Sequence, residues 1–375
     1  MIKFNEPTVT GEEIKNINDV IERAKFSGDG YYSQKSSDLM KKLTGSAGVY
    51  LVPSGTHALE MATLLSDIRK GDEIIMPSFT FSSTANAFIL RGAKIRFIDI
   101  RPDTLNMNEE LIEDAVTERT KAIVPVHYAG VSCEMDKIIN LAKSYGLLVI
   151  EDAAQGILAS FNGKPLGSIG DFGCLSFHET KNAQCGEGGA LLVNDNKNIS
   201  FADILMEKGT DRKQYIRGEI DKYTWRNIGS SFLINELTAA FLYAQLSNIH
   251  EIIKHRLQLW NMYLENLSDV DGLVAPKVPS NCQHNGHIFH IRLKDSVTRN
   301  KLQKYLSEKG IQTATHYVPL HSSPYGSKIA TFVGEDQFTT VESSRLLRLP
   351  LHNKLNEQDI IHISGKIKDF VKSNA

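Results

Sequence analysis

The chain has 375 residues, a formal net charge of −2, and 41% hydrophobic and 23% charged residues. This composition is typical of a globular protein large enough for two domains. The near-neutral charge offers no basic surface for nucleic acid, and no apolar run is long enough to span a membrane. We therefore expect neither nucleic acid nor a membrane as a partner, and we expect a cytoplasmic protein.

The first half of the chain alternates between strand-like and helix-like segments. Thr10 and Glu13 have the spacing of a capping box, which predicts a helix that ends near Gly28. Short runs rich in Val and Ile then alternate with periodic segments. The predicted strands are Val49–Val52, Glu73–Met76, Lys94–Ile98, Ala122–Val126 and Leu147–Ile150, and the predicted helices are 56–67, 83–91, 108–116 and 135–145. This rhythm predicts an α/β fold with a mostly parallel sheet flanked by helices.

The second half begins with a different pattern. Between residues 172 and 194, two apolar strands, GCLSF and GGALLVN, flank the polar segment HETKNAQCGE. A helical stretch from Asn235 to Leu267 leads to a strand over 287–293, a helix over 296–310, a strand over 312–316 and a final helix from Asn356. We predict a large domain over residues 1–250 and a small α/β domain over 251–375.

Lys181 is the first candidate for chemistry. It lies between two apolar strands and just before the glycines of GEGG, where the backbone can approach a bulky group. A buried lysine has a lowered pKa and becomes a nucleophile toward carbonyl carbon. Most lysines are solvated surface charges, so the residue alone is a weak signal.

Other candidates follow the carboxyl ends of the predicted strands, where ligands bind in open α/β sheets. Asp152 could hold a protonated ring nitrogen or could cap a helix. Gly55 and Thr56 open a helix that could bind phosphate or could be an ordinary helix start. Ser176 could reach the same phosphate, or it could be bonded to backbone. Either aromatic of Phe79-Thr80-Phe81 could stack on a flat ring or lie in the core.

In this order the motifs resemble those of the DegT/DnrJ/EryC1/StrS sugar aminotransferases. The resemblance covers nearly the whole chain and is carried by SFHETKNAQCGEGG, MPSFTFSSTANAF, VPVHYAG and EDAAQ. It implies a pyridoxal 5′-phosphate (PLP) enzyme of fold type I, the architecture of aspartate aminotransferase, with a small C-terminal α/β domain. It also implies a homodimer with shared active sites.

The resemblance implies a role for each candidate. Lys181 binds the cofactor covalently and moves the proton, and Asp152 pairs with the ring nitrogen. The remaining cofactor contacts are Gln155 at the ring hydroxyl, Gly55, Thr56 and Ser176 at the phosphate, and Phe81 against the ring. Ser231 stands where the family has an Asn that reaches the neighbouring subunit's phosphate. In the loop HYVPLH, His316, Tyr317 and His321 could contact the sugar or could be solvated.

Some family members act in the synthesis of enterobacterial common antigen or O-antigen. This chain resembles them in the stretches SFTFSSTANAFILRGAKI, PVHYAGVSCEMD, FHETKN and DKYTWRNIGSS. That similarity implies amino transfer from L-glutamate to C4 of a dTDP-4-keto-6-deoxyhexose, giving the galacto product and 2-oxoglutarate. The gluco epimer, or C3 transfer on another nucleotide sugar, is an alternative. A sugar dehydratase is another, although relatives of that type carry His in place of Lys181. The set of Asp152, Gln155, Ser176 and Lys181 argues against a non-catalytic protein.

Two patterns predict no site. Gly28-Asp29-Gly30 follows a helix and lacks a third glycine, so it is no dinucleotide fingerprint. His284, His287 and His290 have no accompanying acids, and the last two would face opposite sides of a strand. We therefore expect no metal. The four cysteines form no CxxC pair, and we expect them to be free thiols.

Overall fold

The fold is built on an eight-stranded sheet in a computed structural model that describes residues 1–374. The strand order is β1-β9-β8-β5-β4-β2-β3-β12. Seven strands run parallel, and β9 alone is antiparallel to both of its neighbours. The strands are β1 Gly48–Val52, β2 Glu73–Pro77, β3 Lys94–Ile98, β4 Thr120–Ile123, β5 Leu148–Asp152, β8 Phe172–Ser176, β9 Gly189–Val193 and β12 Ala330–Phe332. The predicted α/β class with a mostly parallel sheet is confirmed.

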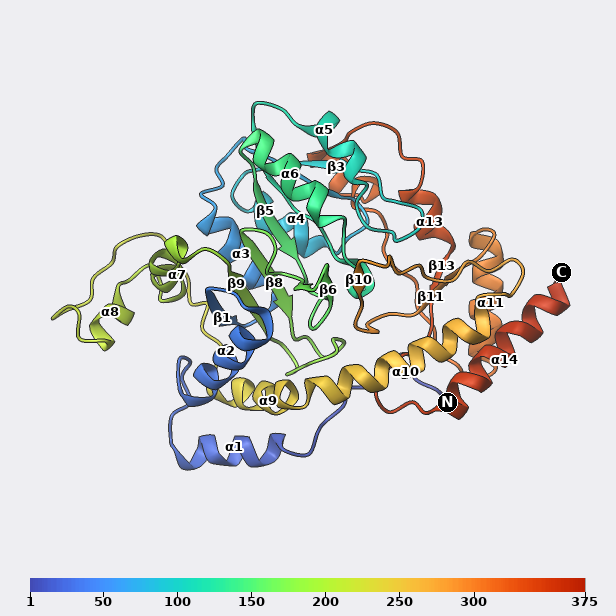
Figure 1. Ribbon diagram of the computed structural model, residues 1–375, viewed down its shortest axis with the longest axis horizontal. Coiled ribbons are helices and arrows are strands. Elements are labelled where there is room, and N and C mark those ends of the chain that lie inside the picture. Colours follow the sequence, from blue (N-terminus) through green and yellow to red (C-terminus); the bar gives the residue numbers. More distant parts are fainter. Residues whose placement is uncertain (375) are drawn as a thin grey trace.

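Helices cover both faces of this sheet, because successive side chains of each strand point to opposite sides. In β2, Ile75 faces one apolar core, whereas Ile74 and Met76 face the other. The first core contains residues of α2 Tyr31–Thr44, α6 Met135–Tyr145 and α9 Glu236–Ser247, and the second contains residues of α3 Gly55–Leu65, α4 Ser82–Ile89 and α7 Ile199–Met206. Helix α1, Glu13–Glu22, packs outside α9 (Figure 1). The sheet is thus buried on both sides, as its uninterrupted apolar strands predict.

The C-terminal part has its own apolar core. Helix α10, Ile249–Leu267, runs from the sheet region to α14, Glu357–Asn374, and contributes Trp260 and Tyr263 to this core (Figure 1). The other elements of this part are α11 Ser296–Glu308, α12 Gly326–Ile329, α13 Thr339–Arg345 and the antiparallel pair β11 His290–Arg292 and β13 Leu346–Arg348. The separate core agrees with a small C-terminal domain, although β12 belongs to the large sheet. The boundary at residue 250 stays a prediction.

The remaining elements are short. They are α5 Ile112–Ala115, α8 Arg212–Ile216 and a three-stranded sheet of β10 Cys282–Gln283, β6 Ser160–Phe161 and β7 Lys164–Pro165. The segment that holds α8 projects away from the body of the molecule (Figure 1). Within residues 1–374, none of the helices combines the length and the apolarity needed to cross a bilayer.

Several local features differ from the predictions, and the first helix ends at Glu22, before the predicted end near Gly28. The helix predicted over 235–267 is two helices, because the chain leaves helical geometry at Asn248, where φ is −109° and ψ is 10°. Residues 312–316 pair with β13 only at Ala314, so they form no strand. Helix α2 was not predicted. Its N-terminus is held from a distant segment, since the Glu236 carboxylate accepts bonds from the backbone N–H groups of Gly30, Tyr32 and Ser33.

Candidate active site

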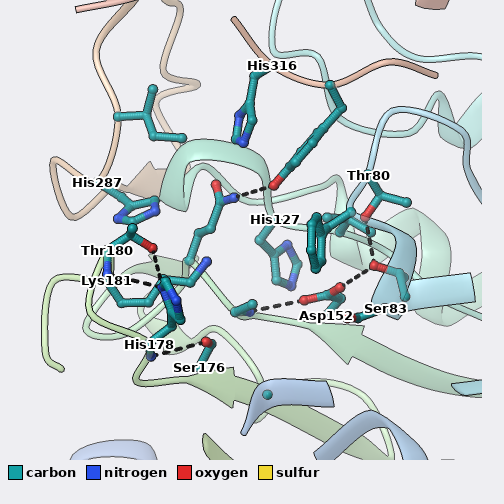
Figure 2. A pocket seen from close by; sticks show the side chains of 18 of the residues that line it. Thr80, Ser83, His127, Asp152, Ser176, His178, Thr180, Lys181, His287 and His316 are labelled. Carbon is teal, nitrogen blue, oxygen red and sulfur yellow. Dashed lines mark hydrogen bonds between the residues drawn. The ribbon is translucent and has the colours of Figure 1, made fainter. Parts of the chain in front are cut away.

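A cavity of about 640 Å³ lies at the carboxyl ends of the parallel strands. Most of the predicted site residues line it, which brings together segments that are far apart in the chain. The predicted residues in its wall are Gly55, Thr56, Phe81, Asp152, Gln155, Ser176, Lys181, His316 and Tyr317. Figure 2 shows Asp152, Ser176, Lys181, His287 and His316 around one space. Their convergence follows from the fold, because the parallel strands end at one edge of the sheet.

One end of the cavity is made by the N-terminus of α3. The Ser54 hydroxyl accepts a bond from the backbone N–H of His57, and the Thr56 hydroxyl lies 2.8 Å from that of Ser83. A Cβ on Gly55 would come within 2.9 Å of the Ser176 Cβ. The glycine therefore lets the helix start lie against the end of β8. Free N–H groups and hydroxyls at a helix start form a binding site for a phosphate group.

Asp152 lies at the end of β5 and is held by two hydrogen bonds. The Thr84 hydroxyl donates to Oδ2 at 2.6 Å, and the backbone N–H of Ala154 donates to Oδ1 at 3.1 Å. The Thr80 hydroxyl lies 2.7 Å from that of Thr84 and extends this chain of bonds. The carboxylate is thus fixed in orientation, with 6% of the residue exposed, and it faces the cavity. A fixed buried carboxylate suits a positively charged ring nitrogen.

Lys181 lies in the loop between β8 and β9. Burial lowers the pKa of its ammonium group from 10.5 to about 8, although the nearby Asp152 carboxylate favours the charged form. The positive charge of Arg348 lowers the pKa further. A lysine with this pKa is partly neutral near neutral pH, so its amine can attack a carbonyl carbon and can exchange protons.

Gln155 joins the sheet edge to the C-terminal part. Its side-chain Oε1 accepts a bond from the Ala129 N–H at 2.6 Å, and its Nε2 donates to the Tyr317 hydroxyl at 3.2 Å. Tyr317 in turn lies against His316, with ring centroids 3.6 Å apart, and His316 Nδ1 is 3.1 Å from the Tyr128 hydroxyl. The loop 316–317 is therefore part of the cavity wall and is not a solvated surface loop.

The structure separates the two candidate aromatic residues. Phe79 is 1% exposed and packs edge-on against Tyr128 in a small apolar cluster. Phe81 is 59% exposed and lines the cavity. Phe79 is the core residue, and only Phe81 is free to contact a flat ring.

Two predicted residues lie outside this cavity wall. Ser231 is exposed and pairs with Glu207 at the base of the projecting segment. His321 points elsewhere, because its Nδ1 is 2.7 Å from the Ser78 hydroxyl and its Nε2 is 3.1 Å from the Asp336 carboxylate. The proposed contacts of Ser231 and His321 stay predictions.

The sequence reasoning missed three residues of the site. Thr84 holds Asp152 from helix α4, and its signal was the hydroxyl-rich run Ser82-Ser83-Thr84 after β2. His287 is buried and bonds through Nδ1 to the Asn182 side chain at 2.9 Å. Arg348 reaches the cavity from β13, and its signal was a charge inside the apolar run LLRLPL.

The three histidines considered as metal ligands have separate partners. His284 packs against Trp260, His287 bonds to Asn182, and His290 lies beside Tyr128. Among residues 1–374, no group of three or more His, Cys, Asp or Glu side chains is arranged to hold a metal ion. The four cysteines are free thiols.

A model of one protein family matches nearly the whole chain. Residues 7–368 match the DegT/DnrJ/EryC1/StrS aminotransferase family. The spore coat polysaccharide biosynthesis protein SpsC of Bacillus subtilis is 32% identical over 383 residues, covering 99% of this chain and 97% of SpsC.

Solved structures agree with the family match. The aminotransferase TlmJ from Streptoalloteichus hindustanus superimposes with a TM-score of 0.91 at 26% identity and covers 100% of both chains. DesV from S. venezuelae superimposes with a TM-score of 0.88 at 27% identity, and the match covers 96% of this chain and 94% of the DesV chain.

The fold and the cavity therefore define a PLP-dependent sugar aminotransferase. The chain belongs to the DegT/DnrJ/EryC1/StrS aminotransferase family. The residues present fit the cofactor: the α3 N-terminus offers donors for a phosphate, Asp152 offers a fixed carboxylate, and Lys181 offers an amine of lowered pKa.

Proposed function

We propose that the protein transfers an amino group from L-glutamate to C4 of a dTDP-4-keto-6-deoxyhexose, giving dTDP-4-amino-4,6-dideoxygalactose and 2-oxoglutarate. The observation that carries the transfer chemistry is Lys181, a buried amine with a pKa of about 8 in the same cavity as Asp152. The sugar and its nucleotide rest on the long similar stretches of sequence, such as SFTFSSTANAFILRGAKI.

The cavity residues divide the work of holding the cofactor. Gly55, Thr56 and Ser176 hold the phosphate, and Phe81 covers the ring face. Asp152 pairs with the ring nitrogen, and Gln155 contacts the ring hydroxyl. When bound, PLP supplies an electron sink for the carbanion that forms on the substrate carbon.

Lys181 moves the proton in both half-reactions. Its lowered pKa matches this task, since a group that both removes and returns a proton works best when its pKa is near the working pH. His316 and Tyr317 contact the sugar in this proposal, and their place in the cavity lining supports it.

The proposed enzyme is a homodimer in which Ser231 reaches the partner's cofactor phosphate. The projecting segment exposes apolar residues that a monomer would leave in water, among them Trp225 at 81% and Ile228 at 49% exposed. Exposed apolar surface of this kind is typical of protein–protein contacts. The position of Ser231 at the base of this segment supports a contact with a neighbouring chain.

The test is incubation of the purified protein with dTDP-4-keto-6-deoxyglucose and L-glutamate, followed by NMR of the product. We expect an axial C4 amine, recognised by small proton couplings at C4. An equatorial amine shows the gluco epimer, a product without nitrogen shows a dehydratase, and an inert substrate shows that the sugar is wrong. Lys181→Ala should abolish turnover yet still bind pyridoxamine phosphate, and full activity in this variant contradicts the proposal.

A further inference from the structure

Arg348 is a cavity-lining cation without an acidic partner. Its Nη2 donates to the Thr315 carbonyl at 3.2 Å, and its guanidinium carbon lies 4.7 Å from the centre of the Phe4 ring. Its Nε is buried and has no hydrogen-bond partner. Within residues 1–374, no carboxylate is among the charges that act on it. Arg348 as a whole is half-buried. A buried donor without a partner, on a charge without a counter-ion, is unfavourable, so the arrangement points to an anion that comes from outside the chain.

Two buried arginines of this region, Arg256 and Arg292, already have partners within the chain. Arg256 also lines the cavity, but its Nε and Nη2 donate to the carbonyl groups of Gly286 and His287. Arg292 also has an unbonded Nε, yet its charge is paired with Glu342 at 2.9 Å. Among these three, only Arg348 combines a free donor, an unpaired charge and a place in the cavity wall.

The backbone fixes Arg348 beside the reacting groups. Arg348 ends β13, pairs with His290 of β11, and exchanges backbone hydrogen bonds with Ala314. This places it next to the loop that carries His316. Its positive charge lowers the pKa values of both His316 and Lys181, which shows that it lies within electrostatic reach of the amine.

We propose that Arg348 binds the α-carboxylate of the amino donor. A guanidinium forms paired hydrogen bonds with a carboxylate, and its unbonded Nε is one of the donors for such a pair. The α-carboxylate is attached to the carbon whose proton Lys181 moves, so it must lie close to Lys181. Phe4 holds the guanidinium from one side and leaves its edge to the ligand. The inference rests on the proposed donor, an amino acid, and is independent of the sugar.

The diphosphate of a nucleotide sugar is the other anion that enters this site. The hexose ring separates it from the C4 carbon that receives nitrogen, so it lies further from Lys181 than an α-carboxylate does. The position of Arg348 near Lys181 therefore favours the donor, and the experiment separates the two sources.

The test compares wild type with Arg348→Gln in the donor half-reaction, in which the PLP absorbance is lost on mixing with the donor alone. Two donors are used: L-glutamate, and 4-aminobutyrate, which lacks the α-carboxylate. Wild type should prefer L-glutamate, and the preference should fall about ten-fold or more in Arg348→Gln, the usual effect of losing a charge-assisted bond. The dissociation constant for dTDP should be unchanged.

Arg345→Gln is the matched control. It removes an arginine three residues away that pairs with Glu342, which keeps Arg292 as a partner. Its donor preference should equal that of wild type. An unchanged donor preference in Arg348→Gln overturns the proposal. If the affinity for dTDP falls at the same time, the anion that Arg348 binds is the diphosphate.

Two further measurements keep the result decisive. If Arg348→Gln does not fold, Arg348→Lys takes its place, because it retains a charge and should show an intermediate donor preference. A wild type that uses both donors equally contradicts the assignment. If wild type accepts no nitrogen from L-glutamate, the proposed donor is wrong. Calorimetric titration with the unreactive dicarboxylate glutarate then decides on Arg348, and equal affinities in wild type and variant refute its role.

Discussion

Replacement of Lys181 by Met should change how the stability of the cofactor-free protein depends on pH. Met fills a similar volume without an ionisable group, so the variant lacks the proton equilibrium of the buried amine. In the wild type, burial lowers the pKa of Lys181 to about 8, against 10.5 for a free lysine, with Asp152 opposing and Arg348 adding to the effect.

The sign follows from proton binding in the two states. Below about pH 8, Lys181 is charged in both states, and the folded protein carries the cost of a buried charge. Between about 8 and 10.5 the unfolded chain binds a proton that the folded protein does not, so stability rises with pH. Above 10.5 both states are neutral and the rise is complete. The difference in pKa corresponds to roughly 3 kcal/mol at about 1.4 kcal/mol per pKa unit.

Urea unfolding of both cofactor-free proteins across this pH range measures the effect. The tyrosines and the other lysines titrate alike in the two proteins. The difference between the free energies of unfolding of wild type and variant therefore reports on Lys181. Between pH 8 and 10.5, we expect the free energy of unfolding of wild type to rise by up to roughly 3 kcal/mol relative to that of Lys181→Met. A difference that stays flat within about 0.5 kcal/mol refutes a buried amine of lowered pKa.

Two substitutions test the walls of the cavity. Thr84→Val removes the 2.6 Å bond to Asp152 and should lower the free energy of unfolding by about 1.5–3 kcal/mol. The control is Thr63→Val, which removes a bond to a neutral carbonyl and should cost about 1 kcal/mol. Equal losses for the two variants in urea unfolding contradict a charged acceptor. Gly189→Ala places a Cβ 2.4 Å from the backbone of the turn before α3 and should weaken PLP binding in a spectroscopic titration. Gly365→Ala meets nothing within 4 Å and is the control, so equal PLP affinities would show that this close approach is unimportant.

The sequence by itself determined most strands of the large sheet and the order of its site residues, whereas β12 was not predicted. The five strands predicted in the first half of the chain occur within three residues of their expected bounds, because apolar runs of Val and Ile bounded by turns have few alternatives in a buried sheet. Since parallel strands end at one edge, the sequence predicts that Asp152, Ser176 and Lys181 lie together.

Tertiary structure alone decided which side chain serves the site where the local pattern allowed two. Phe79 and Phe81 both follow closely after the end of β2. Phe79 lies in the core, whereas Phe81 lines the cavity. The start of α2 depends on Glu236, which lies about two hundred residues further along the chain. Arg348 enters the cavity only because β13 pairs with β11. Such contacts depend on the packing of distant segments, whereas the apolar periodicity that predicts a strand or helix lies within its own stretch of sequence.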